Sequence, residues 1–133
     1  MKENGISSPL VECKFLKDDV RREAKELGMI VWDRPSNSCL ASRVPWGTKV
    51  TAERLCRIEL AETVVKNSTG ARQVRVRDIG GAARIEVGKK DIDRILNSDV
   101  VKMLDKPLRL IGFTSVTIDT CGYVPGGANV VTD

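Results

Sequence analysis

Two short segments of alternating polar and apolar residues, joined through a pair of glycines, constrain the fold more than any other feature. Residues 73–77 read Gln-Val-Arg-Val-Arg and residues 83–87 read Ala-Arg-Ile-Glu-Val, which is typical of half-buried strands. Gly80-Gly81 between them predicts a tight hairpin turn. A turn there fixes the register and places three pairs opposite each other: Val76 and Ile85, Arg77 and Arg84, Arg75 and Glu86.

The polar face of this hairpin carries an unusual set of charges. Arg75, Arg77, Arg84 and Glu86 share it, and the register sets Arg77 directly against Arg84. Like charges in this position destabilise a hairpin. A bound anion would relieve the repulsion, and phosphate suits the fork of an arginine. The alternative is a solvated sheet face on which Arg75 and Glu86 form a weak surface pair.

The remaining periodicity predicts an α+β fold. Helical spacing of apolar residues indicates helices at 17–27, 51–67, 91–96 and 100–107, and short apolar runs indicate strands at 29–32 and 114–119. We expect a small, mostly antiparallel sheet, made of the hairpin and a C-terminal strand, with helices packed on one face. The predicted parts are a helix-strand appendage at 1–33, a cysteine loop at 34–50 and an α+β domain at 51–133.

The cysteine loop has turn chemistry and a thiol beside a cation. Prolines and a glycine bracket residues 35–47, and Cys39 lies four residues before Arg43. A nearby positive charge favours the nucleophilic thiolate. This pattern makes Cys39 the best candidate nucleophile, and the alternative is a buried structural thiol.

Composition excludes several kinds of site. The chain of 133 residues has no histidine, which rules out Ser-His, Cys-His and His-metal arrangements, so acid–base work falls to carboxylates, thiols, lysines or water. The four cysteines form no CxxC pair, which argues against a zinc ribbon. Neither a phosphate-binding P-loop nor a dinucleotide-binding glycine motif is present. We therefore expect no ATP binding by this chain alone.

Charge and hydropathy narrow the partners. A net charge of +4 with 4% aromatic residues suits a small anionic ligand better than nucleic acid, because single-strand readers need aromatic platforms. There is no basic run, no signal peptide and no stretch long enough to span a membrane. We expect a cytoplasmic protein with reduced thiols, bound neither to nucleic acid nor to a membrane.

Taken together, several of these segments resemble one known family. The resemblance rests on the following motifs, which cover nearly the whole chain: Ser7-Ser8-Pro9-Leu10, Lys25-Glu26-Leu27-Gly28, Val31-Trp32-Asp33, Pro35, Ser38-Cys39-Leu40-Ala41-Ser42-Arg43, Pro45, Gly47-Thr48, Val74-Arg75-Val76-Arg77 and Ala83-Arg84-Ile85-Glu86-Val87. In these the chain resembles the C-terminal half of the LarE-type sacrificial sulfur transferases. These belong to the PP-loop ATP pyrophosphatase superfamily and help to make the nickel-pincer cofactor of lactate racemase.

The resemblance implies a reaction. An N-terminal PP-loop domain uses ATP, with magnesium, to adenylate a carboxylate of a pyridinium mononucleotide. The cysteine that matches Cys39 forms a thioester and then gives up its own sulfur, which leaves dehydroalanine. The arginines that match Arg75 and Arg77 hold phosphate, and Glu86 is a catalytic carboxylate with Glu62 near it.

The resemblance also implies supporting residues and an assembly. Arg84, Ser42 and Arg43 complete the predicted phosphate and substrate site, and the family's members form oligomers, so we expect a homo-oligomer. Some relatives hold an iron–sulfur cluster on three cysteines. Here the cysteines other than Cys39 are scattered through the sequence, so we predict no metal site.

One part of the family pattern is missing. The ATP-binding half, with its Ser-Gly-Gly-x-Asp-Ser loop, has no counterpart in these 133 residues. Three accounts stay open: a fragment of a longer protein, a subunit that works with a separate PP-loop ATPase, or a stand-alone module. We therefore weigh two functions. The first is the substrate-binding and sulfur-donor domain of a sulfur transferase, and the second is a non-catalytic anion-binding or oligomerisation module.

Overall fold

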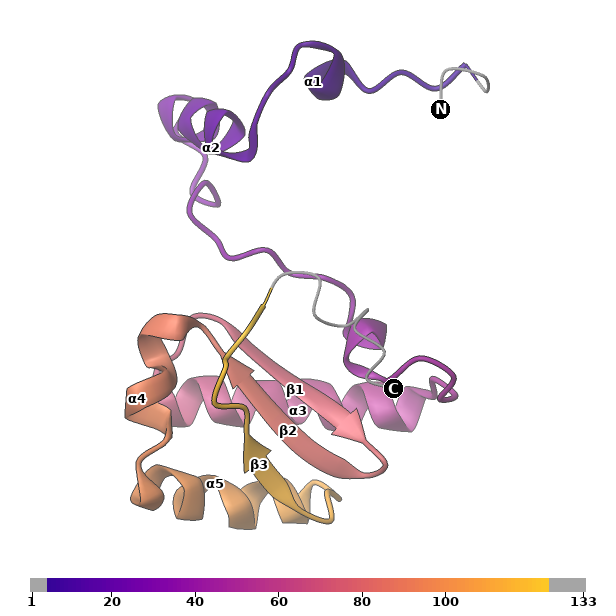
Figure 1. Ribbon diagram of the computed structural model, residues 1–133, viewed down its shortest axis with the longest axis vertical. Coiled ribbons are helices and arrows are strands. Elements are labelled where there is room, and N and C mark those ends of the chain that lie inside the picture. Colours follow the sequence, from indigo (N-terminus) through magenta and orange to yellow (C-terminus); the bar gives the residue numbers. More distant parts are fainter. Residues whose placement is uncertain (1–4, 125–133) are drawn as a thin grey trace. The chain divides into compact units, whose positions relative to one another are not determined.

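The computed structural model describes residues 5–124 and separates into two units, Met1–Ser36 and Asn37–Asp133. The end of the predicted α+β domain, residues 125–133, lies outside the described residues. Figure 1 shows a chain that runs through α1 and α2 in the first unit and then builds a sheet flanked by helices in the second. The described elements, in chain order, are α1 (Pro9–Glu12), α2 (Lys17–Glu26), η2 (Leu40–Arg43), α3 (Ala52–Thr69), β1 (Val74–Ile79), β2 (Ala82–Val87), η3 (Lys89–Asp91), α4 (Ile92–Ile95), α5 (Ser98–Leu110) and β3 (Val116–Ile118).

The hairpin of β1 and β2 forms as the alternation predicts. Val76 pairs with Ile85, Arg77 with Arg84 and Arg75 with Glu86, which confirms the register. Gly80 and Gly81 both have positive φ, +58° and +91°. Two consecutive residues in this region form the turn whose twist matches that of paired strands, and glycine adopts it without steric cost.

The third strand corrects the predicted sheet. β3 lies beside β2 and runs parallel to it, so the order is β1-β2-β3 and the sheet is mixed. The reason is topological: residues 88–115 hold α4 and α5, and a crossover of this length returns the chain to the same end of the sheet. Strand β1 is left as an open edge.

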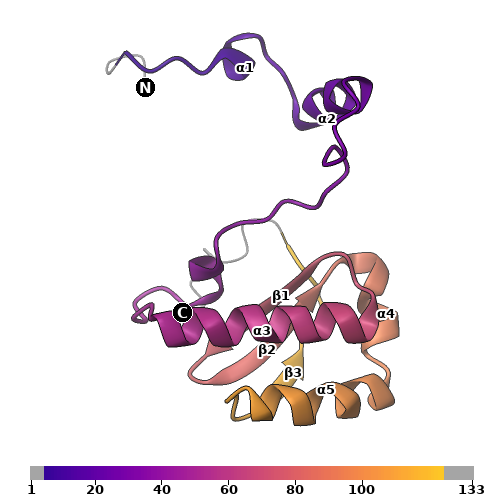
Figure 2. The same ribbon diagram turned by 180° about the vertical axis from the view of Figure 1, so that it is seen from behind.

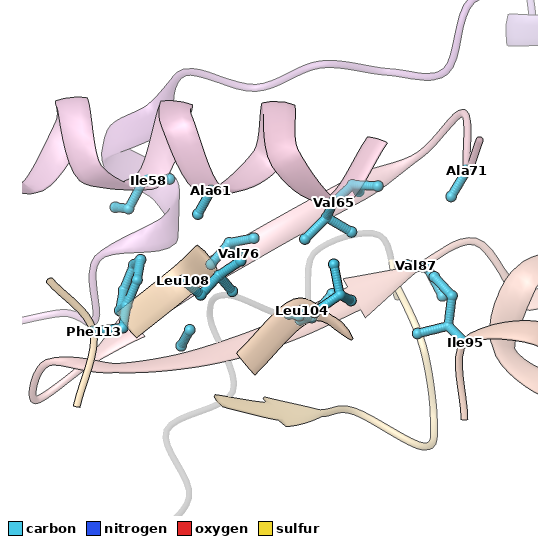
Figure 3. Close-up of a cluster of buried hydrophobic side chains, with 13 residues drawn as sticks. Ile58, Ala61, Val65, Ala71, Val76, Val87, Ile95, Leu104, Leu108 and Phe113 are labelled. Atoms are coloured by element: carbon cyan, nitrogen blue, oxygen red, sulfur yellow. The ribbon is translucent and has the colours of Figure 1, made fainter. Parts of the chain in front are cut away.

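Helices α3 and α5 cover one face of the sheet, as the view from behind shows (Figure 2). Thr51 begins α3 by accepting a hydrogen bond from the Arg54 N–H at 3.2 Å, and Gly70 ends it with φ +68°, so both ends of the helix are capped. In the close-up of the core, the labelled residues Ile58, Ala61 and Val65 of α3 point towards Val76 of β1 and Leu108 of α5 (Figure 3).

Helix α5 is longer than its sequence suggests. The helical spacing predicts an end at Pro107, but α5 continues to Leu110. Proline has no backbone N–H, so the helix lacks one hydrogen bond at residue 107, but the N–H groups of later residues can still donate. The Ile111 N–H accordingly donates to the Pro107 carbonyl at 3.1 Å.

The first unit holds helices and turns, and the predicted strand at 29–32 is wrong. Residues 30–33 form a turn in which the Trp32 N–H donates to the Met29 carbonyl at 3.2 Å. Arg21 donates to the carbonyls of Trp32 and Arg34, each at 2.9 Å. The Arg21 side chain therefore occupies the Trp32 carbonyl, which a strand at 29–32 could otherwise use for pairing. No helix within the described residues is long and apolar enough to cross a membrane.

Candidate functional site

Cys39 begins the short helix η2, which contacts both α3 and the open edge of β1. Its thiol is exposed, so Cys39 is not the buried thiol of the alternative interpretation. Among residues 5–124, no hydrogen bond to this thiol is found. Three donors converge instead on the Cys39 carbonyl: the Ser42 N–H at 3.1 Å, the Ser42 hydroxyl at 2.9 Å and Arg43 at 3.0 Å. The main chain is thus held while the thiol is left open to reaction.

The Arg43 side chain donates hydrogen bonds to several oxygens of this loop. Its residue is 1% exposed, and Nη1 lies 2.9 Å from the carbonyl and from the hydroxyl of Ser38, and 2.9 Å from the Ser42 hydroxyl. Nη2 donates to the Asn37 side chain at 3.3 Å. A substrate-binding role for Arg43 stays a prediction, since the donors found here all point to the protein's own oxygens.

Glu62 of α3 is the ion-pair partner of Arg43. Its Oε1 accepts from Arg43 Nε at 2.8 Å, and Oε2 lies 3.5 Å from Arg43 Nη2. The same Oε1 accepts the Val76 N–H of β1 at 3.3 Å. An edge strand leaves such N–H groups without a ladder partner, so Glu62 ties the open edge of the sheet to the cysteine loop.

On the outer face of the hairpin, the charges pair diagonally. Arg77 Nε and Nη2 donate to the two oxygens of Glu86 at 2.6 and 2.8 Å, and Arg77 Nη1 donates to the Ser42 carbonyl at 2.8 Å. Arg84 lies 3.7 Å from Glu86 and 3.7 Å from Asp119. The Glu86 carboxylate therefore contacts both of the opposed arginines, at the place where the hairpin register predicts an external anion.

Arg75 has a different environment from its neighbours. It is 4% exposed, donates to the Val74 carbonyl at 2.9 Å and lies over the Tyr123 ring at 5.3 Å. Burial lowers the pKa of Arg75, and the positive charge of Arg43 lowers it further. Hydrogen bonds to Glu86 raise the pKa of Arg77. A bound anion would offset the causes that act on Arg75. Burial of both Arg75 and Glu86 also excludes the solvated face and the Arg75–Glu86 surface pair.

A pocket of about 310 Å³ opens beside the loop. Cys39 lines it on the loop side, and Glu59, Glu62, Thr63 and Lys66 line it from α3. Lys66 Nζ is 3.7 Å from Glu62 Oε2 and partly exposed. The structure thus brings together an exposed thiol, carboxylates and an ammonium group around a space large enough for a small ligand.

Most of the predicted site residues are joined in one network of hydrogen bonds and ion pairs. Cys39, Ser42 and Arg43 are in the loop, and Arg77, with Glu86, reaches the loop through Ser42. Arg84 joins through Glu86, whereas Arg75 faces Tyr123. Their predicted roles are not tested by this geometry.

The resemblance placed Glu62 near the site, but sequence reasoning missed the other pocket residues of α3, Glu59, Thr63 and Lys66, and it missed the contacts of Ser38. Glu59 lies three residues before Glu62 and Lys66 lies four residues after it, and this helical spacing is the signal that could have placed both beside Glu62.

Across 5–124 there is no group of three or more histidine, cysteine or acidic residues placed to hold a metal ion. Cys39, Cys13, Cys56 and Cys121 are all free and exposed.

Comparisons with known proteins place the chain among curated relatives. A pyridinium-3,5-bisthiocarboxylic acid mononucleotide synthase of Lactiplantibacillus plantarum is 36% identical over 128 residues, 96% of this chain and 45% of that protein. The chain is related to the LarE-type synthases. This relationship agrees with the resemblance in the motifs, while a match to the C-terminal half of the family stays a prediction.

Two further relatives have no stated function. An uncharacterized protein of Synechocystis is 38% identical over 130 residues, which is 98% of this chain and 48% of that protein. An uncharacterized protein of Methanocaldococcus jannaschii is 32% identical over 119 residues, 89% of this chain and 44% of that protein. This LarE-like chain therefore spans less than half the length of the curated relatives it matches. No protein-family model matches it.

Proposed function

We propose that this chain is the substrate-binding and sulfur-donor domain of a PP-loop-type sulfur transferase. The L. plantarum relative is named for a product with two thiocarboxylic groups on a pyridinium mononucleotide. Making such a product requires sulfur to be delivered to carboxyl carbon. The proposed substrate of this chain is accordingly a phosphorylated, mononucleotide-like carboxylate that has been activated as an acyl adenylate.

The observation that carries the proposal is the arrangement at Cys39. Its carbonyl receives three hydrogen bonds, and its thiol is exposed at a pocket. A group that must attack a bound substrate needs a fixed main chain and an accessible reacting atom. A thiol with only a packing role needs neither of these.

The chemistry balances without an oxidant or reductant. The Cys39 thiolate attacks the acyl carbon and expels AMP, which leaves a thioester. Removal of the proton from the Cys39 Cα supplies the electron pair for the Cα–Cβ double bond, and the Cβ–Sγ bond breaks. The sulfur leaves with its electrons as a thiocarboxylate on the substrate, and residue 39 becomes dehydroalanine.

The other residues have proposed roles around this reaction. Arg75 and Arg77 bind the substrate phosphate, with Arg84, Ser42 and Arg43 supporting the site, and Glu86 serves as a catalytic carboxylate. Burial and then the positive charge of Arg43 lower the pKa of Arg75, and Glu62 acts in the opposite direction. A phosphate beside Arg75 would favour its charged form in the same way, which supports an anion in this region.

Activation of the carboxylate is assigned to a PP-loop ATPase domain or subunit, which would bind ATP and magnesium. The first unit offers a surface for such a partner. Neither α1 nor α2 has a buried residue, and the unit exposes large apolar side chains whose burial would stabilise a complex: Ile6, Leu10, Val11, Phe15, Leu16, Leu27, Met29, Ile30, Val31 and Trp32. In this proposal the protein is cytoplasmic.

The proposal can be tested without the partner. The chain is incubated with nicotinic acid mononucleotide whose carboxyl has been activated as an acyl adenylate, and its mass is followed in time. The expected result is an acyl adduct on Cys39, followed by loss of one hydrogen sulfide from that residue. The Cys39→Ala variant is the control for position, and the exposed thiol of Cys56 is the internal control for simple accessibility.

Two results would contradict this function. One is the absence of any adduct at Cys39, and the other is acylation of Cys39 and Cys56 at the same rate. The second candidate function, an anion-binding or oligomerisation module, is favoured by the charge environment of Arg75 alone. It predicts that Cys39→Ala binds the unactivated mononucleotide as the unaltered chain does, and that no hydrogen sulfide is ever lost.

Self-association belongs to both candidate functions. We propose that the chain forms a homo-oligomer, and light scattering at several concentrations measures its mass directly. A strict monomer at every concentration would contradict this part of the proposal.

A further inference from the structure

The ion pair between Arg43 and Glu62 is buried on both sides, with side-chain exposures of 1% and 6%. Burying two charges costs desolvation energy that their attraction barely recovers, and replacing such pairs by apolar residues is often neutral or stabilising. Stability therefore gives a poor reason for placing this pair here. Orientation gives a better one, because an ion pair with several hydrogen bonds fixes the direction of each group.

The geometry shows what is being oriented. Glu62 takes the Nε side of the Arg43 guanidinium at 2.8 Å, and because the group is planar, Nη1 is directed away from Glu62 and towards the loop. Nη1 has two hydrogens, yet four loop oxygens from Ser38, Cys39 and Ser42 lie within 3.0 Å of it. The position of the loop thus depends on the direction in which Glu62 holds Arg43.

Glu62 is itself fixed by the fold. Its Oε1 accepts the Val76 N–H of the edge strand, and Lys66 one turn later on α3 lies 3.7 Å from Oε2. A continuous chain of contacts therefore runs from the sheet through Glu62 and Arg43 to the main chain at Cys39. This chain of contacts does not include the thiol. It therefore affects the position of the sulfur and not its hydrogen bonding.

We infer that Glu62 is a positioning residue for sulfur transfer, and that it holds Cys39 in reacting position through Arg43. This inference rests on the proposed function, because it names the residue that sets the geometry of the same nucleophile. Glu62 also lines the pocket. The test must therefore separate an action through Arg43 from a direct contact with the substrate.

The experiment compares two reactions of the same thiol in the full chain. Acylation of Cys39 by the activated mononucleotide depends on alignment with a bound substrate, whereas alkylation by iodoacetamide depends only on exposure. Glu62→Gln keeps the size of the side chain and removes its charge. We expect it to slow acylation roughly 10- to 100-fold, the cost of a small misplacement of a reacting group, and to leave alkylation of Cys39 at the rate of the unaltered chain. Glu53→Gln, an exposed position of the same helix, is the matched control and should change neither rate.

A double-variant cycle identifies the route of the effect. Arg43→Met and Glu62→Met are measured singly and together, and thermal unfolding is followed for each. If Glu62 acts through Arg43, the double variant acylates no more slowly than the slower single variant. The apolar pair also keeps the test decisive where a single variant fails to fold, because it leaves no unpaired buried charge. In that case, slowed acylation in a folded double variant supports the inference.

Three outcomes would overturn the inference. Glu62→Gln could acylate at the unaltered rate, a folded double variant could do the same, or the losses of the two single variants could multiply in the double variant, as for two independent substrate contacts. Failure of the proposed function is distinguishable from these. It shows as an unaltered chain that is never acylated at Cys39, and it removes the inference together with the function.

Discussion

Asp78 is the carboxylate that ties the hairpin to helix α3. It is fully buried, its Oδ1 accepts the Gly81 N–H at 3.0 Å, and its Oδ2 lies 2.5 Å from Arg57 Nη2. Arg57 continues the link by donating to the Gly112 carbonyl at 3.1 Å. Asp78 therefore connects the hairpin turn to α3, and Arg57 extends the connection to the loop after α5.

Removing this carboxylate should destabilise the protein. We expect Asp78→Ala to lower the free energy of unfolding by about 3 kcal/mol, because it leaves the Arg57 charge without its partner in a largely buried place. Urea unfolding measures the loss, and Asp93→Ala, an exposed acid on α4, is the control. Equal stability of the two variants would show that Asp78 contributes no more than a surface charge.

Cys39 should contribute almost nothing to stability. Its contacts with the loop are made by its carbonyl, and within the described residues its thiol accepts and donates no hydrogen bond. We expect Cys39→Ala to change the free energy of unfolding by less than about 0.5 kcal/mol, as for an ordinary surface substitution. Thermal unfolding measures it, and a marked loss would show that the side chain has a packing role.

At the residue scale, the sequence identified the charges and could not pair them. The alternation placed Arg77 against Arg84 correctly, because register follows from the local turn. The diagonal bond from Arg77 to Glu86 depends on side-chain direction and on a carbonyl from residue 42. Such long-range partners leave no trace in the spacing of nearby residues.

The segment after β3 is closed against the sheet by Gly122. Its φ is +69°, and a Cβ at this position would lie 2.7 Å from Ile92 Cδ1 and 2.8 Å from the Val87 carbonyl oxygen. The Tyr123 N–H donates to that same carbonyl at 2.8 Å. A glycine here lets the chain approach the sheet closely enough for Tyr123 to reach Arg75.

A side chain at position 122 should destabilise the packing of the segment after β3 against the sheet. We expect Gly122→Ala to lower the free energy of unfolding by about 1–3 kcal/mol more than Gly47→Ala does. Gly47 is the matched control because its φ is +79° and nothing lies within 4 Å of its Cβ position, so it carries the backbone strain without the clash. Urea unfolding compares the two, and equal losses would mean that the neighbours of Gly122 move aside freely.

At the element scale, the sequence predicted what depends on neighbours along the chain. The hairpin and the capped α3 follow from turn and cap residues, and both formed. The direction of β3 depends on the crossover through α4 and α5, and the strand expected at 29–32 depends on a partner strand that residues 5–36 do not supply. Apolar runs of four residues carry no information about such partners.

The two units of the chain contribute unequally to its stability. The buried apolar residues described here extend from Ile58 to Phe113, so they all belong to the unit that begins at Asn37. Helices α1 and α2 have no buried residue and are short enough to be marginal in water by themselves.

Removing the first unit should therefore leave the second one intact. We expect residues 37–133 to unfold cooperatively with the same urea midpoint as the full chain, and a peptide of residues 1–36 to show little helix by circular dichroism. Loss of the cooperative transition on truncation would show that the first unit supports the core.

The way in which the loop is held has a consequence for a cell that uses this chain as proposed. Each reaction would consume one protein molecule, yet the contacts that fix the loop bypass the side chain that is consumed. Spent molecules would then be as well folded and as long-lived as fresh ones, because proteases and chaperones select unfolded chains. They would accumulate and compete for the same ATPase partner. The rate of product formation would therefore be limited by synthesis of new protein and slowed further by competition from the spent molecules. Supply of the product would then follow translation.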